Sequence, residues 1–579
     1  MEDQKSKNQV ESTGSLAAEQ AAGALVKSLF SMTSSQALNH IIDQENAVQL
    51  VPELSHVDFF WLIKKIGEED ALPILKLASL EQWQYLLDLE IWQEYEIDLE
   101  LTSRWLGLLH LADPERLARW LLDEGSGLTY YYFCKRIQVY VREEDDLPDM
   151  PDDYFTLDNV FFIRILDAAQ EEMIRDLIKH LAAEDYTRYQ SLMVNLGGVI
   201  PIEHEEALYR VRTMRLAEDG FLPWEEAMSI YSYRKPETLR AREIPADEKQ
   251  PSPIKVKPEE EQMLVPFAPL LYAQRENLFA EGVRNMDPLL LDRMRIEFAG
   301  LCSQIMAADN VRPDEFEVLI KVCQKAAGYI HLGLEKLAGQ DPFLAEKILK
   351  ENPLVTMFQT GFSRALELKW AAERWIKQSW FKGVGLKPDF WGEEWGGTLN
   401  GLLQKKPRLY IGPSKTDAFK EFETGRELDD CGRLLQRLAV LDRLLAVLAV
   451  QYTIFKSGIE KPFFVFHTLL FNLWSRKQLG LEPGFAPLAL EQVRDLFRLL
   501  RGKSKQEPFE MSGYEEQFIH VFMVYAADFD PEAAAQLKET LRLLWKKFNE
   551  EYEWVATADL DGRYSKFIRI KPRSNVVLH

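Results

Sequence analysis

One stretch of the chain decides its fold. Ser55–Glu90 reads SHVDFFWLIKKI, GEEDALPILKLA and SLEQWQYLLDLE when it is divided every twelve residues. Each copy carries an apolar pair at its eighth and ninth positions, namely Leu62-Ile63, Ile74-Leu75 and Leu86-Leu87. The copies begin with serine, glycine and serine, and an aspartate or glutamine follows three residues later. This spacing is typical of helix N-caps and capping boxes.

The period predicts three short helices in place of one long one. At about 100° per residue, successive copies on a continuous helix would be rotated by about 120°, so their apolar pairs would face three directions. Two-turn helices separated by tight turns bring the pairs to one inner side, and Pro73 falls in the first turn of the second helix. Because such helices are unstable alone, they must stack on their neighbours, and we expect a small superhelical repeat.

This pattern of a polar cap, an acid and an apolar pair resembles two known superhelical modules. One is the N-terminal cytosolic domain of a class of magnesium transporters, and the other is the middle domain of a flagellar motor-switch protein. The resemblance covers residues 50–125 and implies a regulatory or protein-contact module, without a catalytic motif. The whole chain also resembles a family of long bacterial proteins of unknown function, which implies no mechanism.

The remaining sequence predicts an all-α protein of two helical parts. Residues 1–35 are expected to be a largely disordered segment followed by a first helix, and residues 36–235 a helical repeat domain. Residues 236–263 form a proline-rich, charged linker, because proline at this density opposes both helix and core. Residues 264–579 are expected to be a second, mostly helical domain. Asp561-Gly562, between partly alternating runs, suggests a β-hairpin near the C-terminal end.

Composition limits the classes of partner. The 579 residues carry a formal net charge of −23, which argues against nucleic-acid binding and against docking on an anionic membrane, and favours cationic partners. The most apolar region, 434–475, is interrupted by charges, so we expect no membrane span. Four widely spaced cysteines and a polar N-terminus indicate a cytoplasmic protein. The sequence leaves the oligomeric state open.

An acidic run is the first candidate site. Residues 143–153, EEDDLPDMPDD, hold seven carboxylates, and carboxylate oxygens suit Mg²⁺ or Ca²⁺. The alternative is a solvated loop, which the two prolines and the lack of a ligand-spaced glycine favour. The candidate ligands are Asp145, Asp146, Asp149, Asp152 and Asp153.

A glycine- and tryptophan-rich segment is the second candidate. Residues 381–412 break the helical pattern, and a glycine-rich backbone allows a ligand to approach closely. The alternative is an irregular connection whose tryptophans fill the core. The candidate ligand-binding residues are Trp391, Trp395, Lys405, Lys406 and Arg408.

Weaker signals come from histidines and tyrosines. His204 stands beside acids, and Glu516 and His520 are spaced to share a helix face, but surface polar contacts explain both better than a metal does. Residues 130–133, three tyrosines and a phenylalanine, suit an interface or simple packing.

The sequence contains none of the common nucleotide, zinc-protease, hydrolase or EF-hand motifs, so we expect no cofactor and leave open whether it is an enzyme. The favoured hypothesis is a cytoplasmic helical scaffold that binds a protein partner. The alternative is an enzyme or small-ligand-binding protein with its site in residues 381–412. A further alternative is divalent-cation sensing by residues 143–153.

Overall fold

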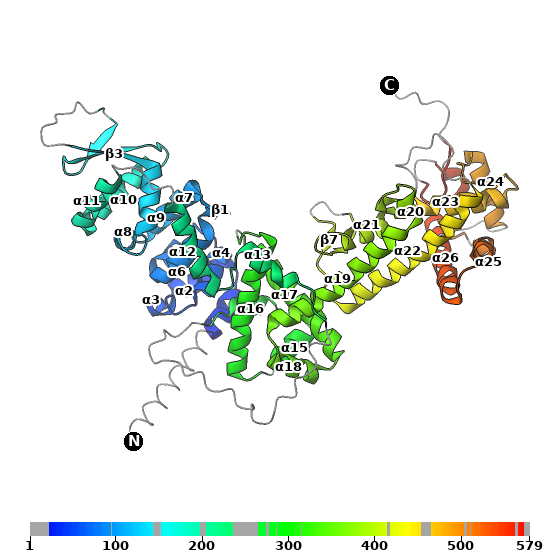
Figure 1. The fold of residues 1–579 in the computed structure, drawn as a ribbon, viewed down its shortest axis with the longest axis horizontal. Coiled ribbons are helices and arrows are strands. Elements are labelled where there is room, and N and C mark those ends of the chain that lie inside the picture. Colours follow the sequence, from blue (N-terminus) through cyan, green and yellow to red (C-terminus); the bar gives the residue numbers. More distant parts are fainter. Residues whose placement is uncertain are drawn as a thin grey trace, which may run out of the picture. The chain divides into compact units, whose positions relative to one another are not determined.

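The chain is predominantly α-helical, which confirms the all-α fold class (Figure 1). It divides into two compact units, unit 1 (Met1–Gly361) and unit 2 (Phe362–His579). Among the described residues, no helix combines the length and apolar content needed to cross a lipid bilayer. The computed structural model describes residues 23–93, 95–142, 151, 153–196, 204–235, 265–273, 277–284, 286–313, 315–413, 417–452, 465–502, 507–509, 511–561 and 565–571.

The three copies of the twelve-residue pattern form three helices near the start of unit 1. The first and third begin where the pattern predicts: Ser55 accepts a hydrogen bond from the Asp58 N–H, and Ser79 forms a reciprocal capping box with Gln82. All three apolar pairs are buried. The first helices of the unit are residues 23–31, α2 (Ser34–Ile42), α3 (Ala47–Leu50), α4 (His56–Ile66), α5 (Leu72–Leu77) and α6 (Leu80–Glu90).

Two details of the repeat prediction are wrong. Gly67 does not cap the second helix: it ends α4 with a φ of 105°, and α5 begins only at Leu72, with Pro73 in its first turn. Asp58 does not complete a reciprocal capping box at the start of α4. Its carboxylate accepts hydrogen bonds from the N–H groups of Phe267 and Ala268, more than 200 residues further along the chain.

The middle of unit 1 continues with helices and includes small sheets that the sequence did not reveal. Strands β1 (Trp92–Gln93) and β2 (Glu96–Ile97) pair antiparallel. Strands β3 (Ile137–Val141), β5 (Phe161–Ile165) and β4 (Tyr154–Thr156) form an antiparallel sheet in that order. The helices are α7 (Leu99–Ala112), α8 (Pro114–Leu122), α9 (Ser126–Arg136), α10 (Glu171–Glu184), α11 (Tyr186–Leu196), α12 (His204–Glu218), α13 (Trp224–Ala227) and the 3₁₀ turn η1 (Met228–Tyr231).

The last helices of unit 1 pack against its first ones. The predicted linker, residues 236–263, lies outside the described residues, but α14 on its far side contacts α4, and α16 contacts α13. The two compact units are divided between Gly361 and Phe362, within α19, and the boundaries predicted from the sequence stay a prediction. The helices are α14 (Ala268–Tyr272), α15 (Leu278–Arg284), α16 (Pro288–Asp309), α17 (Phe316–Ala338), α18 (Pro342–Glu351) and α19 (Leu354–Gln378).

Two glycines let α17 and α19 cross with their backbones in contact. A Cβ at Gly361 would lie 1.9 Å from the Tyr329 carbonyl oxygen, and one at Gly333 would lie 2.2 Å from that of Met357. No side chain fits at either distance, so the crossing requires glycine at both positions.

Unit 2 is built around the long helix α22 (Gly425–Gln451), which packs against α20, α21 and α26. An aromatic cluster fills its core, where the Phe471 ring stacks at 4.5 Å on Phe548 and Trp474 lies edge-on at 5.2 Å to Trp545. The other helices are α20 (Trp380–Gly383), η4 (Pro388–Trp391), α21 (Gly392–Leu402), α23 (Phe466–Gln478), α24 (Leu490–Arg501), η6 (Ser512–Tyr514), α25 (Glu515–Met523), η7 (Val524–Ala526), α26 (Pro531–Tyr552) and η8 (Thr557–Asp559).

The C-terminal β-hairpin is not found among the described residues around Asp561. Residues 557–559 form the 3₁₀ turn η8, and Ile570 makes an isolated parallel bridge with Leu488. Alternation over a few residues did not distinguish a hairpin from an irregular chain that packs on the core. A short antiparallel pair lies elsewhere in unit 2, between β6 (Leu409–Tyr410) and β7 (Phe419–Lys420).

Candidate functional site

Unit 1 contains a groove with a volume of about 1120 Å³. The β1–β2 hairpin, α12 and the C-terminal end of α16 form its walls, together with the turn before α13. Small-molecule pockets typically have volumes of about 300–1000 Å³, so this groove exceeds the usual size.

Aromatic side chains cover much of the groove. Tyr209 on α12 packs edge-on against Tyr95 in the hairpin turn, with ring centroids 5.5 Å apart, and lies tilted against Trp92 at 5.8 Å. Tyr95 keeps 62% of its surface exposed and Trp224 keeps 44%. Exposed tyrosine and tryptophan side chains in a concave surface are typical of the residues that dominate binding energy at interfaces.

Two arginines supply the positive charge of the groove. The Arg212 guanidinium lies 5.3 Å from the Trp92 ring centroid, and its Nε donates to the Asp88 carbonyl oxygen at 2.6 Å. The Nη2 of Arg312 donates to the Trp92 carbonyl oxygen at 2.8 Å. Neither guanidinium forms an ion pair in the described part of the chain. Glu96 is the one carboxylate that lines the described groove, so its formal charge is positive within an acidic protein.

A set of hydrogen bonds fixes the position of the hairpin. The Glu205 carboxylate on α12 accepts from the Ile97 N–H at 3.0 Å and from the Tyr131 hydroxyl at 2.7 Å. Asp98, the next residue, caps α7 by accepting from the N–H groups of Glu100 and Leu101. The hairpin is therefore held from α9, α12 and α7.

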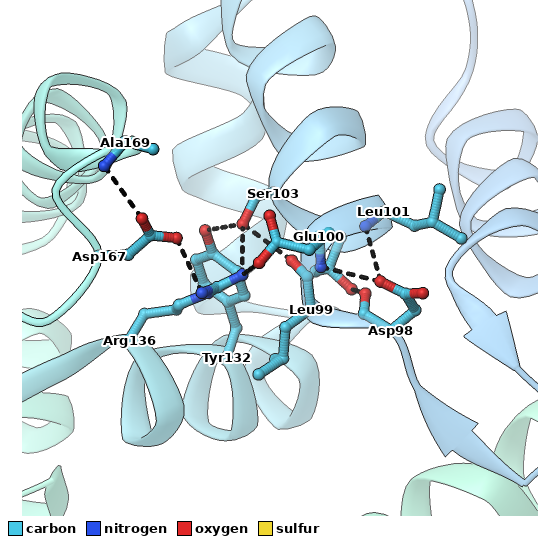
Figure 2. Close-up of polar contacts among 10 residues, drawn as sticks. Asp98, Leu99, Glu100, Leu101, Ser103, Tyr132, Arg136, Asp167 and Ala169 are labelled. Atoms are coloured by element: carbon cyan, nitrogen blue, oxygen red, sulfur yellow. Dashed lines mark hydrogen bonds and ion pairs between the residues drawn. The ribbon is translucent and has the colours of Figure 1, made fainter.

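The polar network in Figure 2 anchors α7 in turn. Arg136, at the end of α9, pairs with Glu100 at 2.6 Å and with Asp167 at 2.8 Å. The buried hydroxyls of Ser103 and Tyr132 lie 2.7 Å apart beside it. These contacts join α7, α9 and the segment before α10, and thus support the hairpin side of the groove.

Unit 2 contains a pocket of about 670 Å³, and Trp391 and Trp395 line it. The other three residues predicted in the same segment lie outside it. Arg408 pairs with Asp417 at 2.6 Å and donates to the Phe419 carbonyl, while Lys405 and Lys406 do not line the pocket. The structure thus brings together the tryptophans without the cations.

The glycines of this segment have a packing role. Gly392–Leu402 is a regular helix, α21, where the sequence suggested an irregular connection. A Cβ at Gly396 would lie 2.5 Å from the Pro388 carbonyl oxygen, and one at Gly401 would lie 2.4 Å from that of Arg408. The glycines therefore let η4 and the start of β6 approach the backbone of α21, which positions the tryptophans.

His467 is the pocket residue that the sequence did not indicate. It stands in the first turn of α23, and its ring packs at 4.8 Å against Phe567 and at 5.3 Å against Phe466. Burial, together with the nearby charges of Lys566 and Lys547, lowers the pKa of His467 to about 3. A lone histidine in an apolar run carries no signal in sequence, because its surroundings come from residues about 100 positions away.

The predicted cation site falls mostly outside the described residues. Asp145, Asp146, Asp149 and Asp152 lie there, and Asp153 pairs with Arg164 at 2.6 Å. Within the described ranges, no three His, Cys, Asp or Glu side chains gather as metal ligands would. Cation sensing by residues 143–153 stays a prediction.

The weaker candidates have ordinary structural partners. His204 bonds to the Gly127 carbonyl oxygen at 3.0 Å, and Glu516 pairs with Arg542 at 3.1 Å. In the aromatic run, residues 131–133 are buried and Tyr130 packs edge-on against His204.

Fold and sites together define a mostly helical protein with a wide aromatic groove in one unit and a smaller aromatic pocket in the other. The chain belongs to the family described as "Family of unknown function (DUF6178)", whose model matches residues 15–571. Searches of curated proteins and of solved structures found no match. The resemblance of residues 50–125 to the magnesium-transporter and motor-switch modules therefore has no support from these comparisons.

Proposed function

We propose that the protein is a cytoplasmic helical scaffold, and that the groove of unit 1 binds a partner protein through an extended or helical segment. The observation that carries this proposal is the combination of exposed aromatic side chains with two arginines that form no ion pair among the described residues. Tyrosine, tryptophan and arginine are the residue types enriched at the energetic centres of protein interfaces.

The charges of the groove define the chemistry of the segment. Arg212 and Arg312 outnumber Glu96, so the segment that enters carries a carboxylate beside aromatic or aliphatic side chains. The net charge of −23 acts over a longer range and favours a partner that is basic overall. The two requirements are compatible, because salt screens charges beyond about 8 Å at physiological ionic strength.

A peptide selection tests this proposal even though the partner is unidentified. The full chain is immobilised, and a displayed library of random dodecapeptides is selected for binding. We expect enriched peptides to combine an acidic residue with aromatic or aliphatic residues.

Single substitutions then locate the binding surface. Tyr95→Ala and Trp224→Ala should each weaken the selected peptides by about tenfold, since truncating an interface hot spot costs more than about 1 kcal/mol. Leu111→Ala is the matched control, because Leu111 is 72% exposed on α7 and does not line the groove. Peptides that bind both groove variants as tightly as the unsubstituted chain, or a selection that enriches none, would overturn the proposal.

A further inference from the structure

The β3–β5–β4 sheet of unit 1 has an open edge at strand β3. One side of β3 pairs with β5, and in the described part of the chain no strand pairs with its other side (Figure 1). Two helices lie against the sheet: Tyr189 of α11 packs edge-on against Phe161 at 6.2 Å, and Arg175 of α10 lies 4.2 Å from the Phe155 ring centroid. The register puts both phenylalanines on the same face. These helices therefore pack on a face of the sheet.

The hydrogen-bond pattern shows which residues of β3 point towards the open edge. The Arg142 N–H donates to the Val160 carbonyl oxygen at 2.9 Å, and the Leu166 N–H donates to the Arg136 carbonyl oxygen at 2.8 Å. In an antiparallel ladder, residues that bond to one neighbouring strand alternate with residues whose N–H and C=O groups point away from it. The even-numbered residues of β3 therefore bond to β5, and the odd-numbered residues direct their backbone groups outward.

The outward backbone groups of β3 are available to another strand. Within the described residues, Val139 and Val141 form no hydrogen bond through these groups, and neither does the Ile137 carbonyl oxygen. The Ile137 N–H donates to the Phe133 carbonyl oxygen at the end of α9. Natural edge strands usually carry a charge, a proline or a bulge that prevents further pairing, but the five residues IQVYV have no charge and no proline, and their register with β5 is continuous.

The side chains of β3 are complementary to those of a second copy. A two-fold axis through Val139 pairs the strand antiparallel with its copy, so that Val139 lies opposite Val139 and Ile137 lies opposite Val141. These side chains are apolar and β-branched, and they lie on the face that α10 and α11 cover, because Val139 pairs with Ile163 and Val141 with Phe161. Val141 is 36% exposed in the single chain, and Ile137 of the second copy would cover it.

The same register satisfies the outward backbone groups. The two central valines exchange two hydrogen bonds, from each Val139 N–H to the carbonyl oxygen of the other. Each Val141 N–H donates to the Ile137 carbonyl oxygen of the other copy. The Ile137 N–H needs no partner, because α9 already supplies one.

We propose that β3 pairs antiparallel with β3 of a second copy of this chain, which joins two three-stranded sheets into one continuous sheet. No charged side chains face each other within the paired strands. A single pair of short strands buries far less surface than the roughly 1,600 Å² of a standard interface, so the dimer is reversible, with a dissociation constant in the micromolar range.

Sedimentation velocity of the full chain tests the proposal. The concentration is varied from about 1 to 200 µM, a range that covers a micromolar dissociation constant. The buffer has physiological ionic strength, because a net charge of −23 drives two copies apart at low salt. We expect a concentration-dependent monomer–dimer equilibrium. A chain that stays monomeric over the whole range would overturn the proposal.

Two lysine variants locate the contact. Val141→Lys places a charge on the open edge and should raise the dimer dissociation constant at least about tenfold. Val160→Lys is the matched control: Val160 is 39% exposed and directly precedes β5, and its carbonyl oxygen accepts from Arg142 on the paired side of β3. Circular dichroism and thermal melting check that both variants are folded. A dimer that responds equally to both variants, or to neither, would count against this edge.

A cysteine variant tests the register in a dimer that stays intact. Val139→Cys places two thiols beside the two-fold axis, where hydrogen-bonded residues of antiparallel strands have Cα atoms about 5.5 Å apart, within the range of a disulfide. Copper phenanthroline with dissolved oxygen as the electron acceptor removes two electrons and two protons from the thiol pair, and an S–S bond forms. On a non-reducing gel we expect a covalent dimer of Val139→Cys, and only the wild-type background for Val160→Cys. Equal crosslinking of the two variants would contradict the proposed pairing.

Discussion

Replacing Asp58 should change how the stability of unit 1 depends on pH. Asp58 is 1% exposed, and its carboxylate accepts the Phe267 N–H at 2.9 Å and the Ala268 N–H at 2.6 Å. It thus caps the N-terminus of α14 from α4. Burial raises the pKa of Asp58 from 3.8 to about 6, and the hydrogen bonds from these amides oppose the rise only in part.

The sign of the pH dependence follows from this pKa. The folded state holds the proton more tightly than the unfolded chain, whose carboxyl titrates near 3.8. The stability that the group contributes is therefore complete below pH 3.8 and is lost as the pH rises through about 6. With about 1.4 kcal/mol per pH unit, the loss amounts to about 3 kcal/mol.

Two variants separate the charge from the hydrogen bonds. Asp58→Asn keeps an acceptor oxygen and cannot ionise, so the wild type should lose about 2.4 kcal/mol of stability relative to it between pH 4 and pH 7, because the unfolded carboxyl is already partly ionised at pH 4. Asp58→Ala leaves two buried N–H groups without an acceptor, and should be about 2–6 kcal/mol less stable than the asparagine variant at every pH.

Hydrogen exchange provides the local measurement. The opening free energy of the amides in residues 265–273 is measured at pH 4, 5, 6 and 7 for the wild type and both variants, after correction for intrinsic exchange rates. The difference in opening free energy between wild type and Asp58→Asn should change with pH in favour of the variant. An opening free-energy difference that stays constant, or that grows in favour of the wild type as the pH rises, would refute the reasoning.

Three further substitutions test other parts of the structure. Asp442→Ala removes a buried carboxylate that accepts hydrogen bonds from two N–H groups at the start of α20. This variant should speed hydrogen exchange in residues 379–384 and leave exchange in α14 unchanged. Equal exchange of residues 379–384 in wild type and variant would contradict the capping role of Asp442. Burial holds the pKa of His467 far below its ordinary 6.5, so the folded protein loses stability as the pH falls from 6.5 towards 3. His467→Phe should therefore unfold with less sensitivity to acid when unfolding is followed by tryptophan fluorescence. An acid-unfolding profile identical to that of the wild type would count against this prediction. Gly361→Ala places a Cβ against a carbonyl oxygen of α17 and should destabilise unit 1 by about 1–3 kcal/mol in thermal unfolding. Gly300→Ala is the control: the space around Gly300 on α16 is open, so this variant should be neutral or stabilising. Similar melting temperatures for the two variants would disprove the close crossing of α17 and α19.

Local signals in the sequence mark several of the helix starts. Asp113, Asp287, Asp341 and Asp530 each precede a proline, and each caps the helix that begins there. A helix start of this kind is readable from the sequence, because a cap involves groups only two or three residues apart. The burial of the apolar pairs follows in the same way from helix periodicity.

Tertiary partners were not predictable from a single sequence. Asp58 looks like a member of a capping box, but its carboxylate serves a helix more than 200 residues away. The strands of the β3–β5–β4 sheet are three to five residues long, too short for alternation to reveal them. Trp391 and Trp395 were identified as candidates because the glycine-rich segment 381–412 interrupts the helical pattern of the sequence. His467 was missed because only the fold brings it to them.

The most direct test of the proposed function is a calorimetric titration of the full chain with one selected dodecapeptide. The same peptide with its acidic residues replaced by lysine is titrated in parallel, and both are repeated with Trp224→Ala and with the control Leu111→Ala. We expect the acidic peptide alone to bind, with an affinity about tenfold lower for Trp224→Ala and unchanged for Leu111→Ala. Equal binding of the two peptides, or an affinity that does not respond to Trp224→Ala, would contradict the claim that this groove is the binding surface of a scaffold.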